Sequence, residues 1–87
     1  MTRTERIHSI LTEHFQPIHL EVVDQSHLHA GHAGARPEGH THYAVVIRSP
    51  HFAGMGKVQM HQAIYRVLGE EFAQGLHALA IDTSAGV

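Results

Sequence analysis

Histidine is the residue type in this sequence with the clearest chemical potential. The chain holds eleven histidines, and five of them lie between Ser26 and Tyr43: His27, His29, His32, His40 and His42. Imidazole is the commonest metal ligand among side chains, and it titrates near neutral pH. Because the chain has no cysteine, disulfides, thiolate zinc sites and cysteine nucleophiles are excluded. Any metal site must therefore use histidine, carboxylate or the ligands of a partner.

The histidine-rich segment is predicted to be a long loop between two strands. Its three glycines and one proline disfavour a regular helix or strand through its middle. The flanking runs Ile18–Val23 and His42–Arg48 are short, β-branched and apolar, as strands are. Residues in such loops take part in binding or catalysis more often than in packing of the core.

The remaining elements supply the layers that must position this loop. Thr2 and Glu5 fit a capping box at the start of a helix over residues 3–14, which Pro17 ends. A connector with Pro50 at a first helical position leads to a long helix over residues 57–73, which Gly75 ends as a left-handed cap residue. A third strand is expected over residues 76–83, followed by a frayed end over 84–87.

The second predicted helix has an apolar stripe at helical spacing, formed by Val58, His61, Ile64, Tyr65, Leu68 and Phe72. On this pattern His61 is expected to be a packed histidine of the core. The element order is helix, strand, strand, helix, strand. Three strands cannot bury an apolar face alone, so both helices should cover one face of the sheet. The predicted fold class is a small α+β two-layer sandwich.

Length and composition set limits on the function. The 87 residues predict a single domain over 1–87, and the 43% hydrophobic share is that of a globular protein. No apolar run approaches the roughly 20 residues that span a bilayer, and no signal-peptide core follows Met1. We therefore expect a cytoplasmic protein without membrane association. The net charge of −2 and six scattered basic residues are a poor footprint for autonomous nucleic-acid binding.

Two motif-like groups are better explained by turns than by catalysis. Asp24 and Ser26 near histidines suggest a hydrolase triad, but no nucleophile elbow accompanies them and serine is expected in a polar turn. The run Gly54-Met55-Gly56-Lys57 lacks the full Gly-x-x-x-x-Gly-Lys spacing of a phosphate-binding loop, so it predicts the start of a helix.

At the level of motifs, the chain resembles the BolA family over roughly residues 4–83. The matching segments occur in a fixed order along nearly the whole chain: Leu20-Glu21-Val22-Val23-Asp24-Gln25-Ser26, the histidine-bearing glycine-rich loop, Thr41-His42-Tyr43, Ser49-Pro50-His51-Phe52-Ala53-Gly54, His61-Gln62-Ala63-Ile64-Tyr65, Glu70-Glu71-Phe72 and His77-Ala78-Leu79-Ala80. This order makes the resemblance more specific than any single histidine pair.

The resemblance implies a BolA fold, related to type II KH domains, and a heterodimer with a monothiol glutaredoxin of the Cys-Gly-Phe-Ser type. Such a pair shares a two-iron, two-sulfur cluster, to which the glutaredoxin and a bound glutathione each supply a thiolate. The BolA-like chain supplies histidine. Carried over by position, the ligands are His77, which opens the last strand, and His29, in the loop after the first strand. Because the loop here is longer and richer in histidine than the usual form, His27 and His32 are alternatives to His29.

The resulting hypothesis is a non-enzymatic adaptor in iron–sulfur trafficking or iron sensing. Imidazoles replace thiolates on one iron of Rieske clusters, so this ligand chemistry has precedent. Two nitrogens leave the site open, and a partner must complete it. Without the resemblance, His77 would be interpreted as a structural residue beside a helix cap.

Three alternatives stay open. The first is a KH-like nucleic-acid-binding transcriptional regulator, with Lys57, Arg66 and Arg48 at the contact region. The second is binding of zinc, copper or nickel by the loop alone, which needs three or four converging ligands. A homodimer is an alternative partnership for the free protein.

Overall fold

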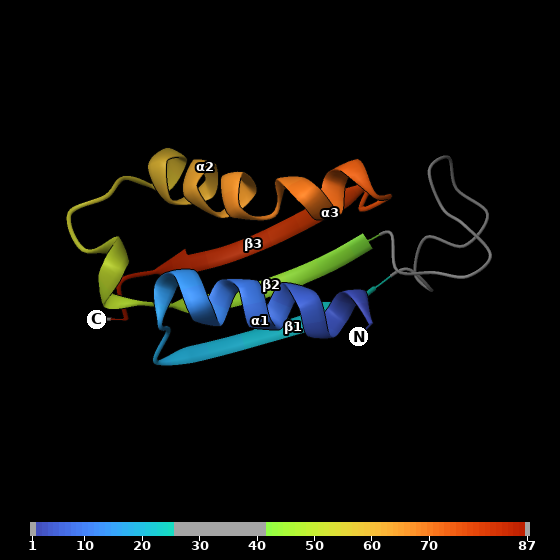
Figure 1. Cartoon of the computed structure of the whole chain (residues 1–87). Helices are drawn as coiled ribbons and strands as arrows, with labels where there is room; N and C mark the ends of the chain where they lie inside the picture. Colours follow the sequence, from blue (N-terminus) through green and yellow to red (C-terminus); the bar gives the residue numbers. More distant parts are fainter. Residues whose placement is uncertain (1, 26–41, 87) are drawn as a thin grey trace.

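The computed structural model describes residues 2–25 and 42–86. In chain order the elements are α1 (Arg3–Phe15), β1 (His19–Asp24), β2 (His42–Arg48), the 3-10 helix η2 (Pro50–Phe52), α2 (Lys57–Val67), α3 (Gly69–Ala73) and β3 (Ala78–Ser84). Figure 1 shows α1 running alongside β1 and β2, with α2 and α3 alongside β3. Among the described residues, none forms a helix with both the length and the apolar character needed to cross a bilayer.

Local sequence signals account for both ends of α1. Thr2 accepts a hydrogen bond from the Glu5 N–H, and the Glu5 carboxylate accepts one from the Thr2 N–H, so the predicted capping box is confirmed. The helix continues one residue beyond the prediction, to Phe15, and Gln16 ends it in the left-handed conformation ahead of Pro17. Ile7, Leu11 and Phe15 face the core from this helix.

The sheet has the strand order β1-β2-β3, so the apolar strand β2 is central, as predicted. β1 pairs with β2 in antiparallel fashion and β3 pairs with β2 in parallel fashion. The register places Val22 and Ile81 on either side of Val45. Because side chains alternate along a strand, these three residues share one face of the sheet.

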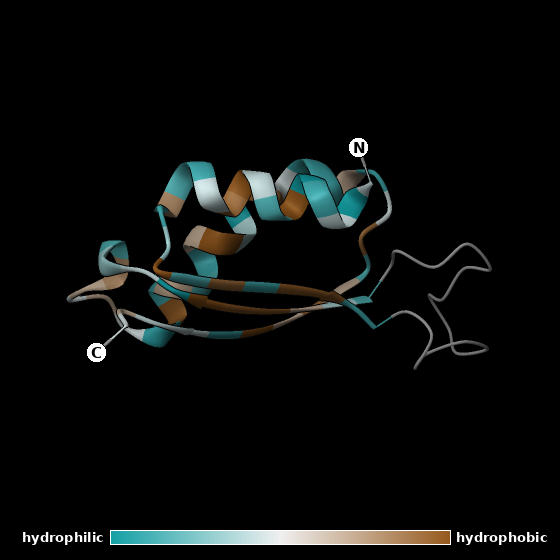
Figure 2. Cartoon of the chain, turned by 90° about the horizontal axis from the view of Figure 1, so that it is seen from below, coloured by the Kyte–Doolittle hydropathy of each residue, from teal (hydrophilic) through white to brown (hydrophobic). Residues whose placement is uncertain are grey.

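All the α-helices lie on one side of this sheet, which gives two layers (Figure 2). The core between the layers is formed by Ile7, Leu11, Phe15, Tyr43, Val45, Ile47, Phe52, Met60, Ile64, Leu68, Leu76 and Leu79. Burial of these side chains removes apolar surface from water at both layers, and this is the main favourable term in folding. The predicted α+β two-layer fold is confirmed.

The predicted helix over residues 57–73 is wrong in one respect, because the chain breaks it at Leu68 and forms α2 and α3 instead. Leu68 departs from helical geometry with ψ of 9°, and Gly69 follows it. Glycine has low helix propensity, which makes this a favourable place for the break. Gly75 then ends α3 with φ of 122°, the positive value expected of a cap glycine.

The predicted apolar stripe is only partly buried. Ile64 and Leu68 face the core, but Val58 is 70% exposed and Tyr65 is 41% exposed. The buried row is Met60, Ile64 and Leu68, spaced four residues apart, so α2 is rotated from the orientation that the hydrophobic pattern favoured. His61 is half-buried at the border of the stripe, and it is not part of the core.

The end of the chain is also more ordered than predicted. Ser84 belongs to β3, and its carbonyl accepts a hydrogen bond of 3.1 Å from the Ser49 N–H. Ala85 packs against the core beyond it. The prediction of a frayed end is therefore wrong for these two residues, because strand pairing with β2 extends to Ser84.

Candidate metal-ligand site at the loop end of the sheet

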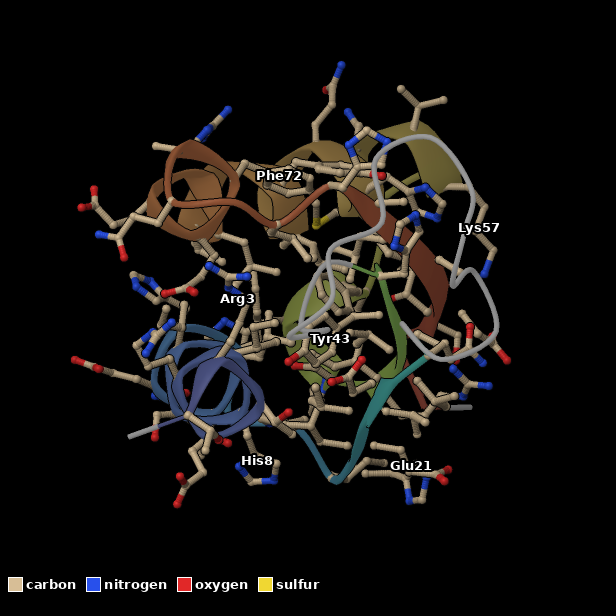
Figure 3. The ribbon with its side chains drawn as sticks, turned by 90° about the vertical axis from the view of Figure 1, so that its right-hand side faces the viewer. Arg3, His8, Glu21, Tyr43, Lys57 and Phe72 are labelled. Atoms are coloured by element: carbon tan, nitrogen blue, oxygen red, sulfur yellow. The ribbon has the colours of Figure 1, made fainter. Side chains whose placement is uncertain are left out.

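Three segments of the chain meet at one end of the sheet, which we call the loop end: β1 finishes there at Asp24, and β2 and β3 begin there at His42 and Ala78. The Gln25 N–H donates a 2.8 Å hydrogen bond to the His42 carbonyl, and His42 is the register partner of Ala78. Gln25 and His42, the described residues on either side of the segment 26–41, are therefore paired with each other next to the start of β3. Figure 3 looks onto this end of the molecule.

His77 stands at the loop end between α3 and β3. On its N-terminal side, Leu76 is 3% exposed and its N–H donates a 2.9 Å hydrogen bond to the Glu71 carbonyl. On its C-terminal side, Ala78 is already in register with β2. The side chain of His77 is exposed. The backbone is therefore fixed on both sides, while the imidazole stays accessible to a partner.

The ring of His77 packs against the ring of His42. The ring centroids are 5.2 Å apart and the planes are tilted by 53°, a common geometry for aromatic pairs. His42 is 7% exposed, so the pair joins one enclosed imidazole to one accessible imidazole. Sequence reasoning identified His42 as the start of a strand but not as a member of the site. Only the parallel register of β2 with β3 brings these residues together.

The second predicted ligand cannot be placed in the same way. His29 and its alternatives His27 and His32 lie outside the described residues. Within the ranges 2–25 and 42–86, no three histidine or carboxylate side chains converge on a position that could hold a metal ion. The described part of the chain thus contributes an accessible imidazole at His77 but not a complete mononuclear site. A metal ion bound at His77 would therefore need further ligands from outside the described residues.

A buried ionic cluster between α1 and α3 stabilises this end of the fold. Glu71 is 2% exposed, and its carboxylate accepts hydrogen bonds from Arg6 at 2.8 and 3.0 Å and from Arg3 Nε at 3.0 Å. Arg3 also donates to the carbonyl of Gln74 at 2.8 Å, and Figure 3 shows it between the two helices. The hydrogen bonds from Arg6, reinforced by Arg3, lower the pKa of Glu71 against the opposing effect of burial.

Tyr43 extends this contact to the sheet. A 3.0 Å hydrogen bond joins its hydroxyl to the hydroxyl of Thr4 on α1. Burial raises the pKa of Tyr43 above its usual value of 10. The neutral phenol therefore persists across the physiological range, so it serves as a structural contact between the layers.

The structure brings two of the predicted nucleic-acid residues, Lys57 and Arg48, to consecutive residues of β3, and the third, Arg66, lies on α2. Lys57 Nζ donates to the Thr83 carbonyl of β3. Arg48 pairs with the Asp82 carboxylate at 3.1 Å and donates to the Asp82 carbonyl at 3.0 Å. Arg66 lines a cavity of about 440 Å³ with Gly54, Gln59 and Gln62. Arg66 is nine positions after Lys57 on α2, which turns their side chains about 180° apart around the helix. The described geometry does not gather the three cations into one patch.

Comparison with known proteins reveals similarity to BolA-like proteins. A family profile described as BolA-like protein matches residues 11–86. The chloroplast protein BOLA1 of Arabidopsis thaliana is 42% identical over 81 residues; the match covers 91% of this chain but only 51% of that protein, so the chain spans about half its length. The DNA-binding transcriptional regulator BolA of Escherichia coli is 42% identical over 79 residues, with 91% of this chain and 71% of that protein covered.

A solved structure agrees with these sequence matches. The BolA domain of SufE1 from Arabidopsis thaliana superposes with a TM-score of 0.86 at 40% identity, and the match covers 100% of this chain and 98% of that domain. The similarity therefore extends over the helices and the sheet together.

Proposed function

The chain belongs to the BolA-like protein family, and from this membership we propose that it is a non-enzymatic adaptor that binds a monothiol glutaredoxin and shares a two-iron, two-sulfur cluster with it. Relatives are named as regulators or as BolA-like proteins and not as enzymes. In the proposed heterodimer the glutaredoxin cysteine and a bound glutathione supply thiolates. This chain supplies imidazole nitrogens from His77 and His29, with His27 and His32 as alternatives for the second position.

The accessibility of His77 at the loop end carries this proposal. A structural histidine beside a helix cap would be expected to be enclosed, whereas the His77 side chain is exposed and its backbone is fixed by Leu76 and Ala78. Gln25, which is paired with His42 beside β3, is four residues before His29. The assignment of His29 in this proposal therefore rests on its position in the sequence.

The chemistry of the donor set agrees with a shared cluster. Imidazole is a neutral ligand and binds iron more reversibly under mild acid than a thiolate does. Replacing thiolate by histidine on one iron also raises the reduction potential of such clusters. A site completed only by a partner suits a protein that receives a cluster and passes it on.

The test is a titration of the protein into a cluster-loaded monothiol glutaredoxin with glutathione, followed by visible circular dichroism. We expect the spectrum to change on mixing with the wild type and to stay close to that of the glutaredoxin alone with His77→Ala. His14→Ala is the matched control, because His14 is an exposed histidine at the C-terminal end of α1, away from the loop end (Figure 1). A spectrum that responds equally to the wild type and to His77→Ala would reject the ligand assignment.

The second ligand is identified by the same titration with three single variants, His27→Ala, His29→Ala and His32→Ala. We expect His29→Ala to behave like His77→Ala and the other two to behave like the wild type. If His27→Ala or His32→Ala has the larger effect, that residue replaces His29 in the proposal. If all three respond like the wild type, the loop histidines do not ligate the cluster.

A second candidate function is binding of nucleic acid as a transcriptional regulator. The name of the Escherichia coli relative favours it, and so does the cavity that Arg66 shares with Gly54 and Gln59. The engagement of Lys57 with Thr83 and of Arg48 with Asp82 weighs against an extended basic surface. Fluorescence anisotropy with duplex DNA at low and physiological salt tests this function, with Arg66→Ala as the variant. Binding that disappears at physiological salt would count against a specific site.

A further inference from the structure

His42 has a fixed position at the centre of the loop end. Its carbonyl accepts the Gln25 N–H of the β1 side, and its register partner on the other side is Ala78 of β3. The side chain is enclosed at 7% exposure. Strand pairing on both sides fixes the backbone of His42, and burial leaves its ring little room to move.

His77 has a fixed backbone but an accessible side chain. An exposed side chain ordinarily samples several rotamers. Here one side of the imidazole contacts the ring of His42, with 5.2 Å between the centroids and a tilt of 53°. The contact restricts the directions in which the His77 nitrogens can point. A ligand side chain that is preorganised in this way loses less conformational entropy when it binds a metal.

We propose that His42 is a positioning residue for His77, whose imidazole it holds in one orientation at the loop end through contact of the two rings. The effect of His42 on cluster binding rests on the proposed function, because the His77 ring that it orients is the proposed cluster ligand. The enclosed His42 is not itself a ligand in this arrangement. Hydrogen-bonded groups that orient a metal-binding histidine typically change metal affinity 10- to 100-fold when they are removed, and we expect the lower end of this range for a contact between rings.

The first test compares His42→Ala and His42→Phe in the titration with cluster-loaded glutaredoxin and glutathione. Phenylalanine keeps an aromatic ring at the position and removes both nitrogens. We expect His42→Ala to weaken formation of the mixed complex about tenfold or more and His42→Phe to restore most of the affinity. Wild-type affinity in His42→Ala would overturn the inference. A defect in His42→Phe as large as in His42→Ala would also overturn it, because a nitrogen of His42 would then be the required group.

The second test uses the free protein and needs neither cluster nor partner. In nuclear magnetic resonance spectra of the wild type, we expect proton–proton Overhauser contacts between the two rings and a single χ1 rotamer for His77. In His42→Ala, the couplings of His77 should change to those of averaged rotamers. A wild-type spectrum without the ring contacts, or with an averaged His77, would contradict the proposal even if every His42 variant failed to fold.

The two tests separate this inference from the function on which it rests. If His77→Ala leaves the cluster spectrum unchanged, the shared-cluster function fails, while the spectra of the free protein still decide whether His42 orients His77. If His77→Ala abolishes the spectral change and His42→Ala does not weaken it, the function stands and the positioning role is rejected. Far-ultraviolet circular dichroism of each variant verifies that the comparison is between folded proteins.

Discussion

Glu71 of α3 accepts a 2.8 Å hydrogen bond from Arg6 of α1, and this contact joins residues that are 65 positions apart in the chain. The carboxylate is 2% exposed, and the backbone carbonyl of the same residue accepts the Leu76 N–H directly before His77. A buried carboxylate is tolerated only where it is paired and hydrogen-bonded, as it is here by two arginines. The interaction therefore ties both helices to the segment that presents His77.

Glu71→Gln should destabilise the protein by about 2–3 kcal/mol, because it removes hydrogen bonds to charged groups and leaves two guanidinium groups without their carboxylate. The unfolding free energy from urea titration measures this. Glu70→Gln is the matched control, since Glu70 is exposed at the neighbouring position and an exposed substitution should change the free energy by less than about 0.5 kcal/mol. Equal effects of the two variants would show that the ionic cluster does not stabilise the fold.

The stability of the wild type should fall in acid in a way that depends on Glu71. The pKa of this carboxyl is lowered from 4.5 in the fold, so below pH 4.5 the unfolded chain binds the proton more readily than the folded one. The contribution of Glu71 to the free energy of unfolding is fully present above the pKa that this carboxyl has in the unfolded chain. It is lost as the pH falls through the lower pKa of the folded protein. Unfolding free energies between pH 6 and pH 3 should therefore drop more steeply in the wild type than in Glu71→Gln. Parallel curves would contradict this prediction.

The two glycines at the ends of α3, Gly69 and Gly75, should change the stability in opposite directions when they are replaced by alanine. Gly75 has φ of 122°, where an L-residue is strained, so Gly75→Ala should cost about 1–2 kcal/mol. Gly69 does not have a positive φ, and among the described residues no atom beyond its chain neighbours and its own helix backbone lies within 4 Å of the point that an alanine methyl group would occupy there. Gly69→Ala should therefore stabilise the fold by about 0.4–1 kcal/mol, through a less flexible unfolded chain. Thermal unfolding of both variants measures the difference in sign.

The orientation of α2 is tested by two apolar truncations on the same helix. Ile64 is fully buried, so Ile64→Ala should cost about 2–5 kcal/mol through lost burial and the cavity that remains. Val58 is 70% exposed, and Val58→Ala should change the free energy by less than about 0.5 kcal/mol. Urea titration of both variants gives the values. A large loss in Val58→Ala would mean that Val58 packs against something other than solvent.

The sequence by itself determined the features that depend on neighbouring residues. The capping box of Thr2 and Glu5 and the helix-ending glycine at Gly75 involve contacts within a few positions, so residue type and spacing are sufficient to predict them. The strands were predicted to within two residues at their ends, and the order of elements favoured a two-layer fold as the simplest solution. Motifs along the chain also identified the family and selected His77.

The tertiary structure decided the features that depend on residues far apart in the chain. Which apolar residues of α2 are buried follows from how the helix packs on the sheet, and the sequence pattern could not choose between Met60 and Val58. The burial of Glu71 needs Arg3 and Arg6 from the other end of the chain. Likewise, the pairing of His42 with His77 follows from strand register. Hydrophobic spacing does not encode register between strands that are distant in sequence, because it arises from packing of the whole sheet.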